Sequence, residues 1–200
     1  MKFSRTFITI IFGASAAVSP ALAQEEGSRS QEVSVQAIGS FVKSTTQDGI
    51  RQTATESGGV LANYRFFFTS RQGVEVDYGY ASNSQLYGAG GGLGNVGSNT
   101  HEFSAAYVYR LRPRLVTPFA LAGVGGLVFD PTNFVGASTQ TRAAFVYGAG
   151  ADIRLAARYF LRAQYRGFVY NSPTFGIDTL AGADRVTHRA EPSIGFGVRF

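Results

Sequence analysis

The last part of this chain, residues 187–200, reads Thr-His-Arg-Ala-Glu-Pro-Ser-Ile-Gly-Phe-Gly-Val-Arg-Phe. From Ala190 onward the even positions are apolar, whereas the odd positions are charged, polar or glycine. A period of two is typical of a β-strand whose two faces meet different environments. The apolar face runs to Phe200 with no polar residue after it. These features predict a closing strand of a barrel whose outer face contacts lipid.

The start of the chain has the three parts of an export signal. Lys2 and Arg5 provide the charged beginning, residues 7–18 the apolar run, and Ala21-Leu22-Ala23 the cleavage site of small residues. The apolar run is shorter than the ~18 residues that a membrane-spanning helix needs. We therefore expect a cleaved signal peptide over residues 1–23, a short periplasmic tail over residues 24–31 and a barrel domain over residues 32–200.

The rest of the sequence divides into eight strand-like runs bounded by turn residues. The runs cover residues 32–42, 59–68, 73–82, 101–110, 116–129, 143–153, 158–170 and 187–200. Short connections (69–72, 111–115, 154–157) alternate with long ones (43–58, 83–100, 130–142, 171–186). Outer-membrane barrels show this asymmetry, with short periplasmic turns and longer outer loops. The sequence therefore predicts an all-β fold, an eight-stranded antiparallel up-and-down transmembrane β-barrel.

One face of these runs is apolar and rich in aromatic residues, and we expect it to point outward. The outward candidates are Tyr64, Phe66, Phe68, Val74, Val76, Tyr78, Tyr80, Phe103, Ala105, Tyr107, Tyr109, Phe119, Leu121, Leu127, Phe145, Tyr147, Leu161, Ala163, Tyr165 and Val169. Phe129 is expected in the aromatic girdle at the loop side. Pro192 lacks a ladder donor and is expected near the outer end of its strand or at a bulge.

The opposite face carries the charges. A charge facing lipid costs ~2–4 kcal/mol at the midplane of the bilayer, so this face is expected to line the lumen. The expected lumen network consists of Arg65, Glu75, Asp77, Glu102, Arg110, Asp152, Arg162, Arg166, Arg189, Glu191 and Arg199. Around the 69–72 turn, either register that keeps inward residues together sets Arg65 opposite Glu75 or Asp77. A similar argument places Arg166 near Glu191. Because side chains can fill an eight-stranded barrel, we expect a plugged, ion-paired interior.

The closing strand resembles the C-terminal strand of bacterial outer-membrane β-barrels. Phe196, Val198 and Phe200 match the alternating apolar pattern with a terminal Phe that the barrel-insertion machinery reads. From Gln24 to Phe200 the chain resembles the small outer-membrane barrels of the OmpA/OmpX type. Residues 59–66 and 73–80 are similar to strands of outer-membrane barrel-domain proteins in general. The resemblance implies an integral protein of the bacterial outer membrane with a structural or surface-interaction, adhesin-like role. It also implies contact with outer-membrane lipid and lipopolysaccharide.

Other chemistry finds little support in the sequence. Removal of Lys2 and Arg5 with the signal peptide lowers the formal net charge from +5 to +3, which is too small and too scattered to predict a nucleic-acid partner. The absence of Cys excludes thiolate metal sites. Gly92, Gly94 and Gly97 match a dinucleotide fingerprint without its strand-and-helix context, and we interpret them as part of an outer loop. The carboxylates Glu75, Asp77 and Glu102 are better interpreted as ion-pair partners than as metal ligands. We therefore expect no cofactor and no metal.

The sequence leaves three alternative functions open. Some eight-stranded barrels deacylate lipid A with a His-x-Ser pair, but His101 and His188 lack that spacing. Both histidines are therefore expected to lie outward without a catalytic role, and the protein is not expected to be an enzyme. A small-solute channel is the second alternative. A soluble, ligand-holding barrel is the third, and it would need an apolar inside and a polar outside.

Overall fold

The structure is a computed structural model, and it describes residues 30–42, 45–47, 50–54, 57–89, 92–111, 114–131, 139–171 and 186–200. The expected signal peptide and almost all of the expected tail lie outside these ranges. None of the described residues forms a helix long and apolar enough to cross a bilayer.

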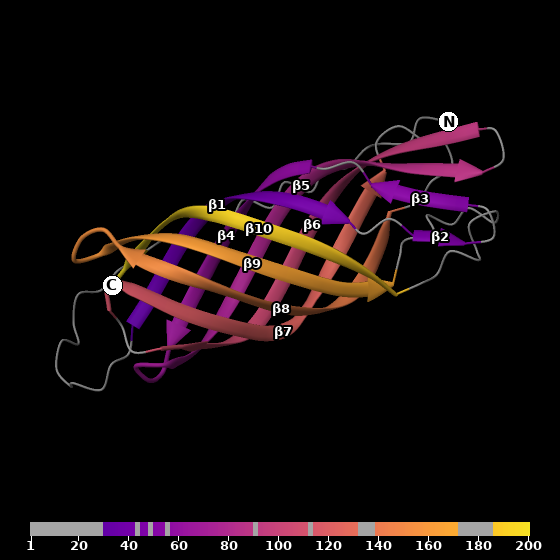
Figure 1. Cartoon of the computed structure of the whole chain (residues 1–200). Coiled ribbons are helices and arrows are strands. Elements are labelled where there is room, and N and C mark those ends of the chain that lie inside the picture. Colours follow the sequence, from indigo (N-terminus) through magenta and orange to yellow (C-terminus); the bar gives the residue numbers. More distant parts are fainter. Residues whose placement is uncertain are drawn as a thin grey trace, which may run out of the picture.

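Eight strands form a closed antiparallel ring (Figure 1). In ring order they are β1 (Ser30–Val42), β4 (Ser57–Phe67), β5 (Gln72–Ala89), β6 (Gly92–Arg110), β7 (Val116–Pro131), β8 (Gln140–Arg154), β9 (Tyr159–Asn171) and β10 (Val186–Arg199). Each strand pairs with the next along the chain, and β10 pairs with β1 to close the ring. The predicted fold class is therefore confirmed.

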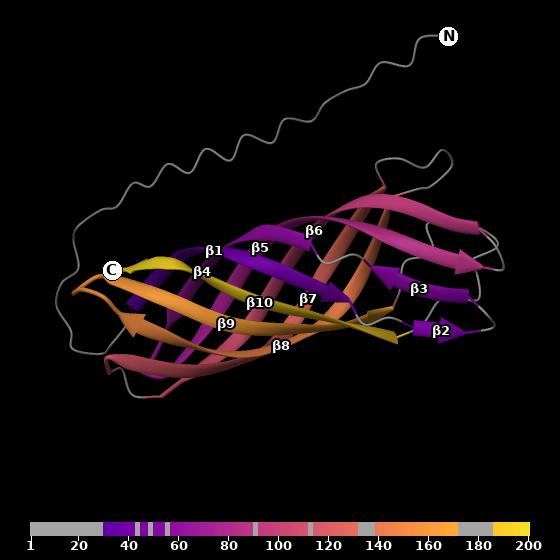
Figure 2. The same cartoon turned by 45° about the horizontal axis from the view of Figure 1, so that its top comes forward.

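The two ends of the barrel differ. At one end, here called the turn end, short connections join β4 to β5, β6 to β7 and β8 to β9. Phe200 lies at this end, where its backbone N–H donates to Gln31 at 3.0 Å and its carbonyl accepts from the Gln31 N–H at 2.9 Å. The other end, here called the loop end, carries the longer segments (Figure 2).

Two of the expected long connections contain strands. The expectation of an outer loop over residues 83–100 is wrong, because β5 and β6 pair without a break from Gln72↔Tyr109 to Ala89↔Gly92. The glycines of the apparent dinucleotide motif lie in β6 of this hairpin. The 43–58 connection contains β2 (Thr45–Gln47) and β3 (Ile50–Ala54), and β3 pairs with the outer part of β5. The outer parts of β5 and β6 are hard to predict from the sequence because they contain Gly and Asn, which are depleted in strands.

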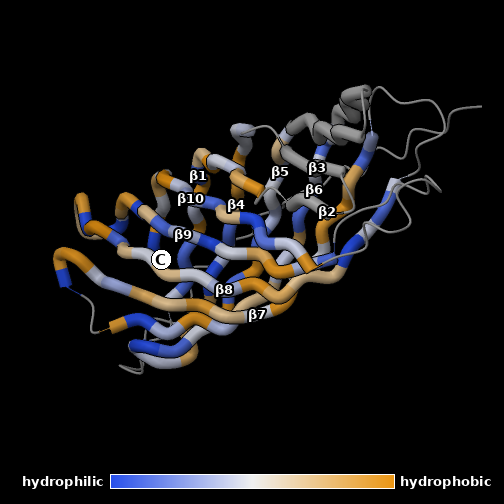
Figure 3. Tube along the Cα trace, turned by 45° about the vertical axis from the view of Figure 1, so that its right-hand side comes forward, coloured by the Kyte–Doolittle hydropathy of each residue, from blue (hydrophilic) through white to orange (hydrophobic). Residues whose placement is uncertain are grey.

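Hydropathy alternates along most strands (Figure 3). The charged side chains are buried in the interior, and large apolar side chains are exposed on the outside. Strand β7 departs from the expected assignment. Phe119, Leu121 and Leu127 were expected to face lipid, but they point into the barrel and are 5%, 5% and 0% exposed. Phe129, expected in the outer girdle, is also buried. Both faces of β7 are apolar, so its own pattern cannot tell inside from outside, whereas pairing with the inward Arg110 fixes Phe119 inside.

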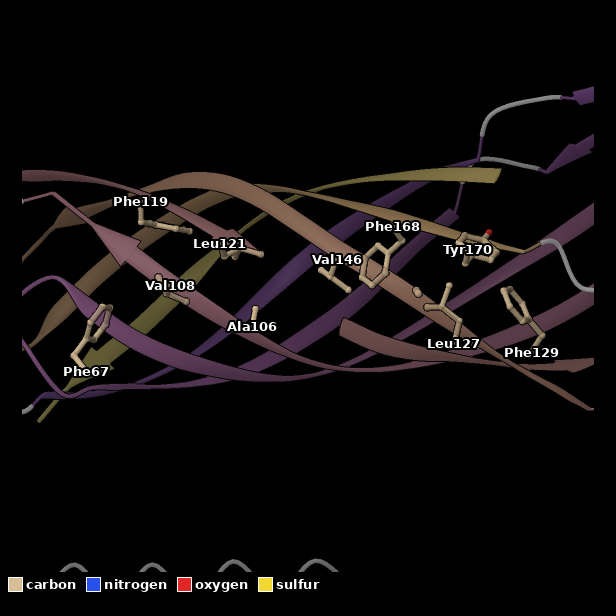
Figure 4. Close-up of a cluster of buried hydrophobic side chains, with 11 residues drawn as sticks. Phe67, Ala106, Val108, Phe119, Leu121, Leu127, Phe129, Val146, Phe168 and Tyr170 are labelled. Carbon is tan, nitrogen blue, oxygen red and sulfur yellow. The ribbon is translucent and has the colours of Figure 1, made fainter. Parts of the chain in front are cut away.

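The interior therefore contains an apolar cluster beside its charges (Figure 4). Its members come mainly from β6, β7, β8 and β9 and lie along one wall of the lumen. They are Phe67, Ala106, Val108, Phe119, Leu121, Leu127, Phe129, Ala144, Val146, Phe168 and Tyr170. The expectation that the charged face of the strands lines the lumen is thus correct for part of the wall only.

Pro192 lies in the middle of β10, neither at the outer end nor at a bulge as expected. Its side chain faces outward, and its pairing with Tyr165 of β9 keeps the register of the whole strand. The β1 side of the ladder is interrupted between Ile38↔Ser193 and Phe41↔Ala190. The register is the same on both sides of this gap, so the strand accommodates the missing donor by losing pairs locally.

Candidate functional site: a buried ion-pair network in the lumen

Glu32 is the centre of the turn-end half of the network. Its carboxylate lies 2.6 Å from Arg110 Nη1, 2.8 Å from Arg162 Nη2 and 2.7 Å from Arg199 Nη2. The side chain is fully buried. Glu32 is absent from the set predicted from the sequence, although its even parity with Ser34 and Gln36 would have placed it inside. Glu32 is the first residue of the predicted strand 32–42, and a charged residue at a strand end is compatible with a solvent-exposed position as well as with an inward one.

Two further ion pairs near Glu32 each connect neighbouring strands, β4 with β5 and β8 with β9. Arg65 is opposite Glu75 in the β4–β5 ladder, and its Nε forms an ion pair with that carboxylate. Arg162 binds Asp152 with two hydrogen bonds, from Nε at 2.6 Å and from Nη2 at 2.8 Å. This bidentate geometry holds the guanidinium in one orientation. All four side chains are buried.

The loop-end half of the network is built on two arginines. Arg166 forms ion pairs with Glu102 and Glu191 and lies 3.4 Å from Asp77 through Nη1. Arg189 Nη2 lies 3.0 Å from Glu102 and 2.6 Å from Glu191. Glu191 and Arg166 are directly opposite in the β9–β10 ladder. Two cations therefore serve three carboxylates in this half.

The network connects opposite walls of the ring. β10 and β6 are four strands apart in ring order, and Arg189 and Glu102 join them. β9 and β5 are likewise opposite, and Arg166 and Asp77 join them. With Glu32 included, the set holds six arginines and six carboxylates and is formally neutral. Removing one partner of such a buried pair is strongly destabilising because the remaining charge is uncompensated.

Aromatic rings of the apolar wall cover the guanidinium groups. Arg65 Cζ lies 3.9 Å from the centroid of Phe119, and Arg110 Cζ lies 3.5 Å from that of Phe67. A cation over a ring face is attracted by the ring quadrupole, and the attraction is larger when water is excluded. The inward position of Phe119 therefore links the apolar wall to the ionic network.

The other residues of interest lie on the outer surface. Phe196 and Phe200 are 67% and 58% exposed, on the lipid-facing side of the closing strand with Val198. His101 and His188 each pair with a tyrosine: Tyr78 Oη is 2.9 Å from His101 Nδ1, and Tyr147 Oη is 2.8 Å from His188 Nε2. Within the described ranges, no group of three or more acidic or histidine residues could hold a metal ion.

The fold and its charged lumen define a class of protein, the small β-barrels of the bacterial outer membrane. The sequence profile of the outer membrane protein beta-barrel domain family matches residues 9–200, and the chain belongs to this family. The family identification made from the sequence is confirmed, and with it the outer-membrane location.

Solved structures show the same fold at low sequence identity. The outer membrane protein OprG from Pseudomonas aeruginosa is 15% identical, with a TM-score of 0.65, covering 87% of this chain and 97% of that one. Neisserial surface protein A (NspA) is 16% identical, with a TM-score of 0.63 and coverages of 85% and 97%. Ail, the attachment invasion locus protein of Yersinia pestis, was solved with the heparin analogue sucrose octasulfate. It is 19% identical, with a TM-score of 0.54 and coverages of 86% and 99%. Among curated proteins no match was found.

Proposed function

We propose that this protein is a plugged, non-enzymatic barrel with a structural and surface-interaction role in the bacterial envelope. The observation that carries the proposal is the set of ion pairs between opposite walls, such as Arg189–Glu102 at 3.0 Å. An eight-stranded barrel is just wide enough for side chains to fill it. Here the filling consists of arginine–carboxylate pairs on one side and packed aromatic rings on the other.

The first consequence of a plugged lumen concerns ion conductance. We expect the purified barrel in a planar bilayer to show no stable, large open level, because the guanidinium groups of Arg162 and Arg166 are fully buried within the lumen. An open porin in the same bilayer serves as the positive control. A stable large conductance from the folded barrel would contradict the plugged lumen and favour the channel alternative.

The outer surface supports integration in lipid. Large apolar side chains are exposed around the ring, among them Val35, Val76, Phe103, Phe145 and Phe196. We propose that they contact outer-membrane lipid and lipopolysaccharide. The proposal includes export by a signal peptide over residues 1–23, cleaved before insertion. It also includes recognition of Phe196, Val198 and Phe200 by the barrel-insertion machinery.

The surface-interaction role is assigned to the β5–β6 hairpin. It extends past the last β6–β7 pair, Ser98↔Pro131, to Ala89↔Gly92, and β3 widens it into a small sheet at the loop end. An extended sheet at the loop end offers backbone hydrogen-bonding groups to a surface partner.

The outer part of the hairpin can be removed while every β6–β7 pair of the barrel is kept, although β3 then loses its partner strand. Asn83 and Ser98 are directly paired, so residues 84–97 can be replaced by an Asn-Gly turn that suits a two-residue hairpin. We expect bacteria that display the shortened barrel to adhere to epithelial cells several-fold less than bacteria with the full chain, measured at equal surface display. Heat-dependent gel mobility checks that the shortened barrel is folded. Equal adherence of the two folded proteins would contradict the assignment.

A further inference from the structure

A gap in backbone pairing lies at the seam where β10 closes the ring on β1. The register of the two strands is the same on both sides of the gap, and it sets Gly39 opposite Pro192. Gln31 and Phe200 exchange both of their backbone hydrogen bonds, at 2.9 and 3.0 Å. Pairs of this kind alternate along an antiparallel ladder, so Gly39 and Pro192 stand where two bonds would again be exchanged. Because proline has no N–H, the carbonyl group of Gly39 lacks the donor that residue 192 would otherwise supply.

The position of Gly39 along β1 places this carbonyl group in the outer leaflet. Gly39 follows Gln31, at the turn end, by eight residues. With a rise of ~3.4 Å per residue and a tilt of ~40°, this separation corresponds to about 20 Å along the membrane normal. The apolar band of an outer-membrane barrel is about 25 Å tall, so the carbonyl group lies inside the band, near its outer edge. An acceptor without a donor is unfavourable in hydrocarbon, and a lipid that brings a donor to this depth is therefore favoured.

A groove of about 400 Å³ surrounds the gap. A Cβ atom at Gly39 would lie 3.0 Å from Phe41 Cε2 and 3.8 Å from Pro192 Cγ, so these two rings border the groove beside the carbonyl group. Both rings belong to the outward-facing residues of their strands. The groove therefore opens toward lipid. It is lined by Ala37, Ile38, Gly39, Pro192, Ser193 and Ile194.

The outer face of the seam is apolar from the groove toward the turn end. Ile194 is 54% exposed and lies opposite Ala37. The next outward pair is Val35 and Phe196, which are 59% and 67% exposed. This strip leads from the carbonyl group toward the middle of the bilayer, which is the direction that an acyl chain of an outer-leaflet lipid takes. A chain lying along it covers apolar side chains while its head-group end stays beside Gly39.

We propose that this groove binds a 3-hydroxyacyl chain of lipid A, whose hydroxyl group donates a hydrogen bond to the Gly39 carbonyl. A hydroxyl group on the third carbon of an acyl chain lies close to the head group, which matches the depth of Gly39 near the edge of the apolar band. The inference rests on the proposed function, because it requires the outer wall to contact lipid A and the loop end to face the outer leaflet. An unsubstituted acyl chain fills the same groove but carries no donor at this depth. The carbonyl group therefore sets a preference between the two kinds of chain.

Native mass spectrometry of the full barrel in detergent measures this preference with two synthetic probes that differ by one oxygen atom per chain. They are phosphatidylglycerol with 3-hydroxytetradecanoyl chains and phosphatidylglycerol with tetradecanoyl chains. We expect the unaltered barrel to retain the hydroxylated probe about fivefold more, the ratio for one hydrogen bond to a carbonyl group that otherwise lacks a donor. Lipid A should displace the hydroxylated probe. Equal retention of the two probes, or failure of lipid A to compete, would overturn the proposal.

Pro192→Ala tests the same carbonyl group by supplying the missing N–H, which can donate to Gly39. The ratio of the two probes should fall to about one, while heat-dependent gel mobility shows a barrel that is still folded. Pro118→Ala is the matched control, because it makes the same change on an outward-facing proline of β7 near the turn end and should keep the fivefold ratio. A Pro192→Ala barrel with an unchanged ratio would contradict the role of the carbonyl group.

A second variant tests the groove independently of its hydrogen bond. Ala37→Phe keeps the outward face of β1 apolar but fills the groove, and it should reduce the retention of both probes several-fold. Unchanged retention of the hydroxylated probe by this folded variant would also overturn the proposal. A barrel that shows no hydroxyl preference and no open conductance would leave the plugged lumen intact, so the two proposals fail separately.

Discussion

Replacing Glu32 by glutamine is expected to lower the free energy of unfolding of the barrel by about 3–5 kcal/mol, the range for breaking a buried ion pair. The Glu32 carboxylate is within 2.8 Å of nitrogen atoms of Arg110, Arg162 and Arg199. Glutamine keeps the volume but removes the charge, and its amide group adds donors facing three cations. Asp152 would remain the ion-pair partner of Arg162, whereas Arg110 and Arg199 would lose the carboxylate they share.

Urea unfolding of the barrel in lipid vesicles, followed by heat-dependent gel mobility, measures this effect. Asp130→Asn is the matched control, because it makes the same chemical change on an exposed side chain whose oxygen accepts from Thr139 at 2.9 Å. The control is expected to change the free energy by less than about 0.5 kcal/mol. A Glu32→Gln barrel as stable as the control would show that Glu32 is not the centre of the network.

Most of the fold follows from the period of two in the sequence. In a pleated strand, parity decides the side, so one charged residue in a strand places all its even or odd neighbours. Parity put Arg162, Gln164 and Arg166 on the inside of β9, where they are buried. The short turn between β4 and β5 limited the register to two choices, and the structure has the one that pairs Arg65 with Glu75.

The sequence-based prediction is wrong in two places: in a strand that has no charged residue, and in a hairpin that is held together by backbone pairing. β7 has no charge between Val116 and Phe129, so its inward face could be identified only from its neighbours in the closed sheet. The extended β5–β6 hairpin contains many glycines and small polar residues, and backbone pairing along an existing ladder needs no special side chains. Parity also cannot say which inward charges meet across the lumen, because that depends on how the ring closes. The contact between Arg189 and Glu102, which are 87 residues apart, is of this kind.

Replacing Arg166 by methionine is expected to destabilise the barrel by about 3–5 kcal/mol, because three buried carboxylates lose a common cation. Glu102 and Glu191 would still have Arg189, at 3.0 and 2.6 Å. Asp77 differs from these two glutamates in its partners. Among the described residues, its ion-pair partner is Arg166, with Nη1 at 3.4 Å, and Ser104 Oγ donates a hydrogen bond to it at 2.8 Å. The Asp77 charge is therefore the one left without compensation.

This difference predicts that Asp77→Asn has opposite effects on the free energy of unfolding in the unaltered barrel and in the Arg166→Met barrel. In the unaltered barrel, Asp77→Asn removes a partner of Arg166 and should be destabilising, whereas in the Arg166→Met background it removes a surplus charge and should restore stability. The coupling free energy from the double-mutant cycle should reach about 1–3 kcal/mol. Asp152→Asn is the control, because Asp152 pairs with Arg162 and should be destabilising in both backgrounds. If Asp77→Asn lowers stability equally in both backgrounds, Asp77 is neutralised by something other than Arg166, and the loop-end half of the network would have to be reassigned.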